Sequence, residues 1–319
     1  MSIGFAQFRR RLLGLSPEAV RFDRRGFRGA TPQMRERIEN IGNAFLDGYH
    51  VALESSSSRQ LENKLAGVEL ELRGFAFEGA AMCLALMDFL TPWRRDRVAT
   101  FLQGAGNAHA YMVHVGIGWI WARIPFGFRR LQSKLDPLLG WLAFDGWGFH
   151  EGFFHFRNDG SQQPPERLRG YELRAFDQGF GRSLWFVNGG NVEWVSKTIS
   201  KFSSLRQADL WSGIGLAVTC AGMASENDLC QLRAAAGGYL AQVAQGSAFA
   251  AKARQRAGNS TDYTDRAARI LCGLSANEAA SVTDDALEKL PIDAEQPAYE
   301  IWRRRIQDYF AKALHPNPI

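Results

Sequence analysis

The chain has 319 residues, of which 46% are hydrophobic and 22% charged, and it carries a net charge of +5. This balance permits a large buried core and excludes a chain that is disordered throughout. No stretch approaches the roughly 20 apolar residues that a membrane-spanning helix needs, which argues against an integral membrane protein.

The N-terminus lacks the pattern of a signal peptide, because its apolar residues precede its arginines and no small-residue cleavage site follows. The four cysteines are far apart and show no CxxC spacing. Free thiols in a reducing compartment are therefore favoured over disulfides, and we expect a cytoplasmic protein.

Residues 1–37 are expected to form a basic N-terminal arm. This segment has nine arginines but only three acidic residues, Glu18, Asp23 and Glu36. The arm could meet an anionic membrane surface, which would place the protein at the periphery of a membrane, or an acidic carrier protein. A solvated, frayed terminus explains the same composition. Nucleic acid is not expected as a partner, because no binding motif accompanies the arm.

Helix signals follow along the chain. Ser16 and Thr31 each stand before a proline, which is the usual pairing of an N-cap with the first helical turn. The second of these signals opens an apolar stripe with helical spacing, formed by Met34, Ile38, Ile41, Phe45 and Tyr49. No sustained strand alternation is present. Residues 157–170, rich in Gly, Pro and polar residues, predict a long loop.

A marker of two small residues, separated by one position, recurs along the chain at intervals of 30–37 residues. Its first glycines are Gly79, Gly116, Gly146, Gly179, Gly213 and Gly246. A period near 33 residues is typical of stacked helix pairs, and small residues let neighbouring helix backbones approach closely. The sequence therefore predicts one all-α domain over residues 1–319, with about six tetratricopeptide-like repeats and a cap at each end.

The residue before each marker glycine is polar in five of six copies. These residues are Glu78, Val115, Asp145, Gln178, Ser212 and Gln245, and the residues four positions later are Met82, Trp119, Phe149, Arg182, Leu216 and Phe249. Positions four apart share a helix face. If that face is concave, the register predicts an aromatic groove with a few hydrogen-bonding groups. The alternative is that these polar residues bond helix ends and loops between repeats.

The histidines carry a weak metal signal. His109 and His114, like His150 and His155, are five residues apart and so do not share a helix face. Buried, hydrogen-bonded histidines are therefore favoured over a metal site. In "DQGFGR" (177–182), Asp177, Gln178 and Arg182 form a compact polar cluster that is either structural or orients a substrate.

Several segments together resemble the DUF1702 family, including members associated with enediyne polyketide biosynthesis. They are "RRGF" (24–27), "RGFAFEGAAM" (73–82), "HAYMVHVGIGW" (109–119), "DPLLGWLAFDGWGFH" (136–150), "DQGFGRSLWF" (177–186), "AQGSAFAAKAR" (244–254), "AARILCGLSANEAA" (267–280) and "PAYEIWRRRI" (297–306). The resemblance covers nearly the whole chain. It implies an accessory protein acting on, or holding, a linear polyene near a polyketide synthase carrier domain and membrane-associated partners.

The resemblance supplies no catalytic residues, so the candidates come from the repeat register and its neighbourhood. Candidates for catalysis are Glu78, His114, Asp145, His150, Asp177 and Arg182. Candidates for binding the polyene are Tyr111, Trp119, Phe149, Gln178, Trp185, Gln245 and Phe249. No metal or cofactor is evident. The competing hypothesis is a non-catalytic helical-repeat scaffold that joins biosynthetic proteins.

Overall fold

The computed structural model describes residues 2–91, 93–124, 126–222, 224–291 and 294–314. All regular elements in these ranges are helical. The helices are α1 (Ser2–Leu13), α2 (Phe22–Arg25), α3 (Pro32–Glu54), α4 (Ser58–Ala66), α5 (Arg73–Leu90), α6 (Arg97–Gln103), α7 (Ala110–Arg123), α8 (Phe128–Gln132), α9 (Leu142–His155), α10 (Tyr171–Val187), α11 (Val192–Ile199), α12 (Ser204–Ala221), α13 (Glu226–Ala236), α14 (Leu240–Arg256), α15 (Asp262–Cys272), α16 (Ala276–Asp285) and α17 (Ala298–Leu314). Four 3-10 turns accompany them: η1 (Pro17–Val20), η2 (Ala105–Asn107), η3 (Leu139–Trp141) and η4 (Gly237–Tyr239). The all-α prediction is confirmed.

Local sequence explains where the first long helix begins. The Thr31 hydroxyl accepts the Met34 N–H at 3.2 Å, and Pro32 occupies the first turn. The stripe from Met34 to Tyr49 is buried along its whole length. Ser16 caps only the short turn η1, after which the chain makes α2. The N-terminal residues therefore fold against the body of the protein, with Arg10 paired to Glu54.

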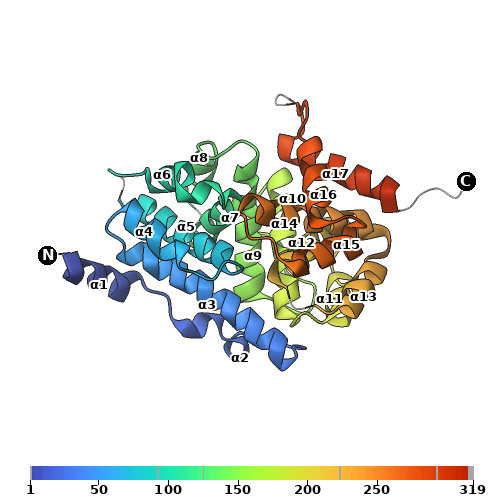
Figure 1. The fold of residues 1–319 in the computed structure, drawn as a ribbon, viewed down its shortest axis with the longest axis horizontal. Helices are drawn as coiled ribbons and strands as arrows, with labels where there is room; N and C mark the ends of the chain where they lie inside the picture. The colour runs from blue at the N-terminus through green and yellow to red at the C-terminus, as the bar shows by residue number, and fades with distance from the viewer. Residues whose placement is uncertain (1, 92, 125, 223, 292–293, 315–319) are drawn as a thin grey trace, which may run out of the picture.

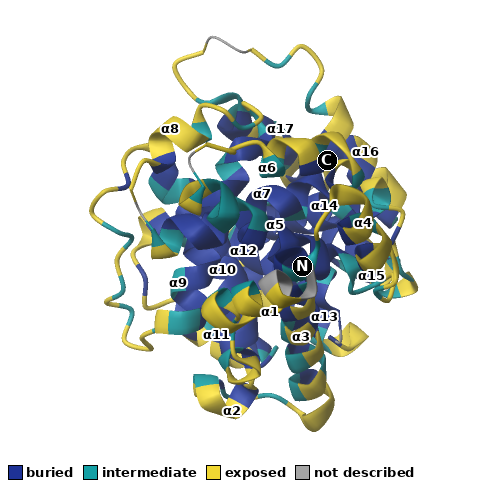
Figure 2. Ribbon diagram, turned by 90° about the vertical axis from the view of Figure 1, so that its left-hand side faces the viewer, coloured by how far each residue is buried: buried dark blue, intermediate teal, exposed yellow. Residues whose placement is uncertain are grey.

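The repeats appear as a row of seven long helices, α3, α5, α7, α9, α10, α12 and α14, each packed against the next (Figure 1). The shorter helices lie outside this row, where exposed residues concentrate (Figure 2). Neighbouring long helices run in the same direction. At the starts of α9 and α10, the ring centres of Trp141 and Tyr171 are 5.1 Å apart. Near the ends of the same helices, the ring centres of Phe153 and Phe186 are 6.4 Å apart. The chain between α9 and α10 has no outer helix.

The marker glycines hold this row together. A Cβ placed on any first glycine would lie 1.7–2.2 Å from a carbonyl oxygen of the preceding long helix, so only glycine permits the observed backbone approach. The contacts are Gly79 with Phe45, Gly116 with Glu78, Gly146 with Val115, Gly179 with Asp145, Gly213 with Gln178 and Gly246 with Ser212. In four copies the second small residue is a glycine that meets the next helix in the same way; these are Gly118, Gly148, Gly181 and Gly215. The predicted role of the small residues in helix packing is confirmed.

The row curves until its last helices meet its first. Arg37 of α3 donates to the Ala221 carbonyl at the end of α12 at 2.8 Å. Arg256 of α14 donates to the Asn107 carbonyl at 3.1 Å, beside the start of α7. Because the ends meet, the inner faces of the long helices enclose a packed core and leave little open groove. No helix of the described residues is long and apolar enough to cross a membrane.

Candidate functional site

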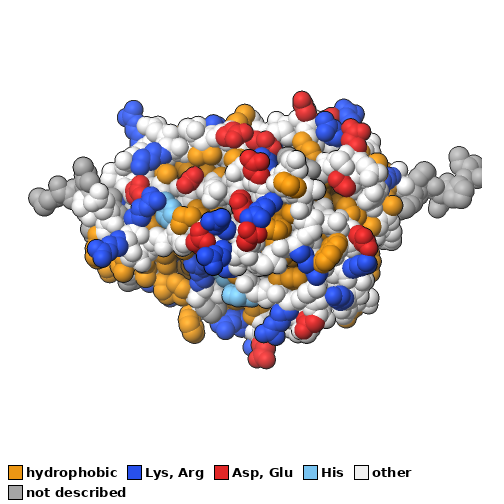
Figure 3. Space-filling view, turned by 90° about the horizontal axis from the view of Figure 1, so that it is seen from below, with side chains coloured by type: hydrophobic (Ala, Val, Ile, Leu, Met, Phe, Trp, Pro, Cys, Tyr) orange, Lys and Arg blue, Asp and Glu red, His pale blue; other side chains and the backbone are white. Residues whose placement is uncertain are grey.

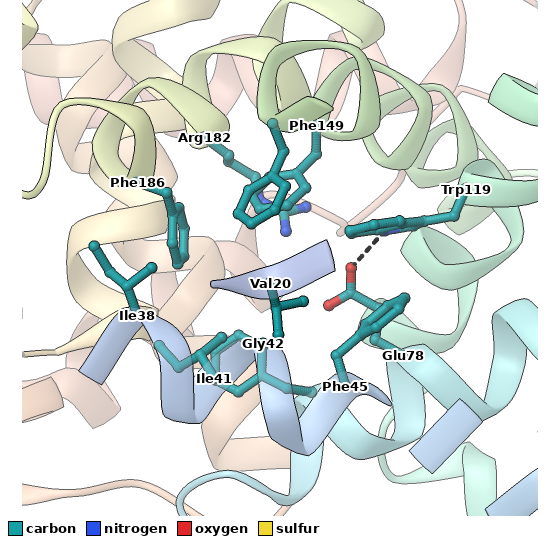
Figure 4. A pocket seen from close by; sticks show the side chains of 12 residues that line it. Val20, Ile38, Ile41, Gly42, Phe45, Glu78, Trp119, Phe149, Arg182 and Phe186 are labelled. Atoms are coloured by element: carbon teal, nitrogen blue, oxygen red, sulfur yellow. Dashed lines mark hydrogen bonds between the residues drawn. The ribbon is translucent and has the colours of Figure 1, made fainter. Parts of the chain in front are cut away.

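A cavity of about 40 Å³ lies between the inner faces of α3, α5, α7, α9 and α10. Its wall is mostly aromatic, and the lining rings belong to Phe45, Phe75, Trp119, Phe149, Phe153 and Phe186. Glu78 and Arg182 are its two charged lining residues (Figure 4). Val20 of η1 contributes to the wall from the N-terminal side. The cavity thus combines an apolar interior with two groups of opposite charge.

Glu78 is buried, and one of its carboxyl oxygens accepts the Trp119 Nε1–H at 2.9 Å. The other oxygen is directed toward the cavity (Figure 4). Burial raises the pKa of Glu78 to about 7, although the charge of Arg182 and the indole N–H both act to lower it. At neutral pH this carboxyl can therefore either donate or accept a proton.

Arg182 enters the cavity from α10, with its guanidinium 4.9 Å from the centre of the Phe149 ring. It forms an ion pair with Asp145, which is fully buried. Asp145 also accepts a hydrogen bond from Gln178 Nε2 at 2.8 Å, and the same amide donates to the Tyr299 hydroxyl at 3.2 Å. The charge of Arg182 is therefore already compensated on the side away from the cavity.

Ser212 and Gln245, which precede the last two marker glycines, belong to a second buried polar cluster. The Ser212 hydroxyl donates to Gln245 Oε1 at 2.8 Å, and Arg303 Nε donates to the same oxygen at 3.3 Å. Arg303 also donates to Asp209 at 2.8 Å. These bonds join α12 and α14 to the C-terminal helix α17. Each of the five polar residues that precede a marker glycine thus bonds a neighbouring helix. Among these five, Glu78 alone lines the cavity.

The remaining catalytic candidates lie apart from the cavity. Both carboxyl oxygens of Asp177 accept a hydrogen bond from Arg206 Nε, at 2.9 and 3.1 Å. His114 is buried, its Nδ1 lies 2.7 Å from the Ala110 carbonyl, and burial lowers its pKa. His150 packs edge-on against Trp119 with ring centres 5.7 Å apart, just behind the cavity wall.

Four of the predicted binding residues also lie elsewhere in the core. Tyr111 and Phe249 pack around Trp302 of α17, at 6.5 and 4.5 Å between ring centres. Trp185 is buried on α10, and Gln245 belongs to the cluster around Arg303. The structure brings together Glu78, Trp119, Phe149 and Arg182 from the predicted set, with Asp145 and Gln178 directly behind them.

One group has metal-ligand composition. The ligand atoms of His150, Glu151 and His155 lie within 4.8 Å of one another. Arg123 donates its Nε–H to His150 Nε2 at 3.3 Å, which places a cation beside the group and leaves the proton of a neutral ring on Nδ1. Glu151 accepts a hydrogen bond from His155 Nδ1 at 3.0 Å. Two separate hydrogen bonds, Arg123 with His150 and His155 with Glu151, fit this geometry better than a metal centre.

Sequence reasoning missed the cavity wall supplied by the N-terminal helices. Phe45 precedes Glu78 by 33 residues, which is one repeat. Its carbonyl contacts Gly79 in the same way that the Glu78 carbonyl contacts Gly116, so α3 is a further copy of the repeat. The signal was present as Gly48, the small residue three positions after Phe45. Val20 and Phe186 carried no comparable pattern.

The profile of the family DUF1702, described as "Protein of unknown function (DUF1702)", matches residues 4–310. No curated protein and no solved structure matches the chain at a significant level. The match spans all seven long helices and the cavity between them. The chain therefore belongs to the DUF1702 family.

Proposed function

We propose that this protein acts on a linear, polyene-like intermediate of enediyne polyketide core biosynthesis and that Glu78 transfers a proton to or from it. The observation that supports this most directly is Glu78 itself. It is a buried carboxyl with a pKa of about 7, set in an aromatic wall with one oxygen toward the cavity. General acid–base catalysis works best when the pKa of the group lies near the working pH.

The surrounding residues suit this chemistry. Aromatic side chains offer flat apolar surfaces against which a conjugated chain can pack. When protonated Glu78 gives its proton to the ligand, Trp119 and the nearby charge of Arg182 stabilise the carboxylate that remains. The carboxylate then takes a proton from another carbon of the protonated chain, which re-forms a double bond, returns Glu78 to its starting state and leaves the polyene isomerised with no net change in protons.

A polyene needs more space than the cavity offers, because about 40 Å³ holds only a few water molecules. Val20 closes one side, and a Cβ placed on Gly42 would meet the Val20 Cβ at 2.6 Å. We propose that the segment around η1 moves outward when the ligand enters. This movement would expose the cavity and leave the contacts between the long helices in place.

The scaffold alternative has less support. Helical-repeat scaffolds bind their partners on an extended concave surface. Here the inner faces of the repeats are packed against one another and against α17. Contacts with a polyketide synthase carrier domain, with membrane-associated pathway proteins and a peripheral membrane location belong to the same proposal. They are supported by the basic N-terminal segment and by the apolar nature of a polyene.

The decisive experiment is complementation of a gene deletion, followed by profiling of polyene intermediates. Wild-type protein restores the normal profile, whereas Glu78→Gln, which keeps the size of the side chain, leaves the substrate to accumulate. Glu151→Gln is the matched control, since Glu151 is a partly buried carboxyl outside the cavity. Full restoration by Glu78→Gln at wild-type protein levels would refute the proposal.

A further inference from the structure

Three segments in the N-terminal half share one composition. Each places a large exposed apolar side chain next to a run of arginines: "FRRRLL" (8–13), "WRR" (93–95) and "FGFRR" (126–130). Trp93 is 82% exposed, Phe126 75%, Leu12 68% and Phe8 58%. Single exposed apolar side chains are common on protein surfaces, and Leu205 is exposed as well. These side chains differ from it because each stands next to a run of arginines.

The direction of the long helices brings these segments to one edge of the molecule. Trp93 follows the end of α5, and Phe126 follows the end of α7. α1 is tied to the end of α3, where Arg9 donates to the Ser55 carbonyl at 3.4 Å. Because α3, α5 and α7 are consecutive members of the row, their ends lie roughly 8–10 Å apart from one to the next.

The edge therefore carries an apolar, basic strip some 20–30 Å long. In the view from below, apolar side chains gather at the end of the molecule built from the N-terminal helices, with arginine and lysine side chains beside them (Figure 3). Arg11, Arg95 and Arg130 are exposed within the strip. The corresponding ends of α10, α12 and α14 lack the pattern, since small or polar residues follow them: Asn188, Gly222 and Ala257.

We infer that this strip, formed by residues 8–12, 89–91, 93–95 and 126–131, docks the protein on the surface of an anionic lipid membrane. Aromatic side chains next to arginines match the interface of a bilayer, where rings sit among the headgroups and guanidinium groups meet lipid phosphates. The inference deepens the proposed peripheral location and rests on that part of the proposed function alone. It names the surface and the lipid charge.

Charge favours lipid over a second copy of the chain. Two copies meeting through this strip would bring arginines against arginines, which like-charge repulsion opposes. The apolar side chains also lie on three separate segments with arginines between them, and an anionic surface satisfies both kinds of group at once. Docking would place α1 on the membrane only four residues before η1, whose Val20 closes the cavity.

The test is co-sedimentation of the full chain with vesicles of phosphatidylcholine, with or without phosphatidylglycerol. Wild-type protein binds the vesicles that contain phosphatidylglycerol. The double variant Trp93→Glu/Phe126→Glu lowers the partition coefficient by about tenfold or more, since two rings leave the interface and two negative charges enter. Arg94→Gln/Arg95→Gln lowers it about fivefold per residue and weakens its dependence on salt.

Leu205→Glu is the matched control. Leu205 is 89% exposed at the start of α12, on the opposite edge of the row, and its substitution leaves vesicle binding unchanged. Absence of wild-type binding to anionic vesicles, or equal losses in the strip variant and the control, overturns the inference. A concentration-dependent dimer that Trp93→Glu dissociates, without vesicle binding, assigns the strip to a second copy instead. Glu78→Gln retains vesicle binding, so failure of the proposed chemistry is distinguishable from failure of docking.

Discussion

Trp119 of α7 donates its indole N–H to Glu78 of α5 at 2.9 Å, inside a mostly aromatic wall. The two residues are 41 positions apart, and the close approach of Gly116 to the Glu78 carbonyl sets the spacing of their helices. The bond stabilises the ionised carboxylate, whereas burial opposes it. The protonation of Glu78 is thus set by the packing of two repeats.

Replacement of Trp119 by Phe should raise the pKa of Glu78 above its present value near 7. Phenylalanine keeps an aromatic ring in the wall, although a smaller one than the indole, and the donor that favours the carboxylate is lost. Titration of the carboxyl carbon by NMR on glutamate-labelled protein measures the shift. Trp194→Phe on the outer helix α11 is the control and should leave the titration unchanged. A lower pKa in Trp119→Phe would contradict the assigned role of the indole.

Glu78 should also make stability depend on pH. Its pKa is about 7 in the folded protein against a usual 4.5, so the folded state binds more protons between these values. Stability from this group is therefore present below pH 4.5 and is lost as the pH rises toward 7. The free energy of unfolding of Glu78→Gln, relative to that of wild type, should rise by on the order of 3 kcal/mol between pH 4.5 and 7. Urea unfolding of both proteins across this range measures the difference, and a constant difference would contradict the raised pKa.

The pair of Asp177 and Arg206 should prove important for stability. Asp177→Asn leaves the buried guanidinium without its charged partner, which costs about 3–5 kcal/mol in comparable pairs. Thermal unfolding measures the loss. Glu193→Gln breaks the exposed pair with Lys197 and should cause no measurable change. A catalytic defect in folded Asp177→Asn, with unchanged stability, would instead return Asp177 to the active site.

The marker glycines should not tolerate a methyl group. In Gly179→Ala the new Cβ would lie 1.7 Å from the Asp145 carbonyl, so α9 and α10 must separate and the Asp145–Arg182 pair with them. We expect a loss of several kcal/mol or failure to fold. Gly238→Ala, where nothing lies within 4 Å of the added atom, should fold normally. Equal stability of the two variants would show that close packing of the row is not required.

Widening the closure at Val20 tests how the cavity opens. Gly42→Val pushes against the Val20 side chain and should displace η1. We expect an environment-sensitive apolar dye to bind Gly42→Val more tightly than wild type, with little change in far-ultraviolet circular dichroism. Weaker dye binding by a folded Gly42→Val would place the entrance elsewhere.

The sequence by itself predicted the helical class, the repeat and the packing role of Gly146 and its equivalents. These follow from local chemistry, because a residue between two close backbones must be small wherever the fold places it. It also predicted Glu78, Trp119, Phe149 and Arg182 as members of one site. Phe45 was missed because its copy of the marker has Leu46 in place of the first glycine.

Only the tertiary structure decided how far the row of helices curves. The ends of the row meet, so most of the repeat positions that were predicted to line an open groove are buried. Gln178, Ser212 and Gln245 therefore bond neighbouring helices instead of a ligand. Glu78 remains at a cavity because α3 and Val20 approach it without filling the space. Such curvature is the sum of small rotations between successive repeats, and no single segment of the sequence encodes that sum.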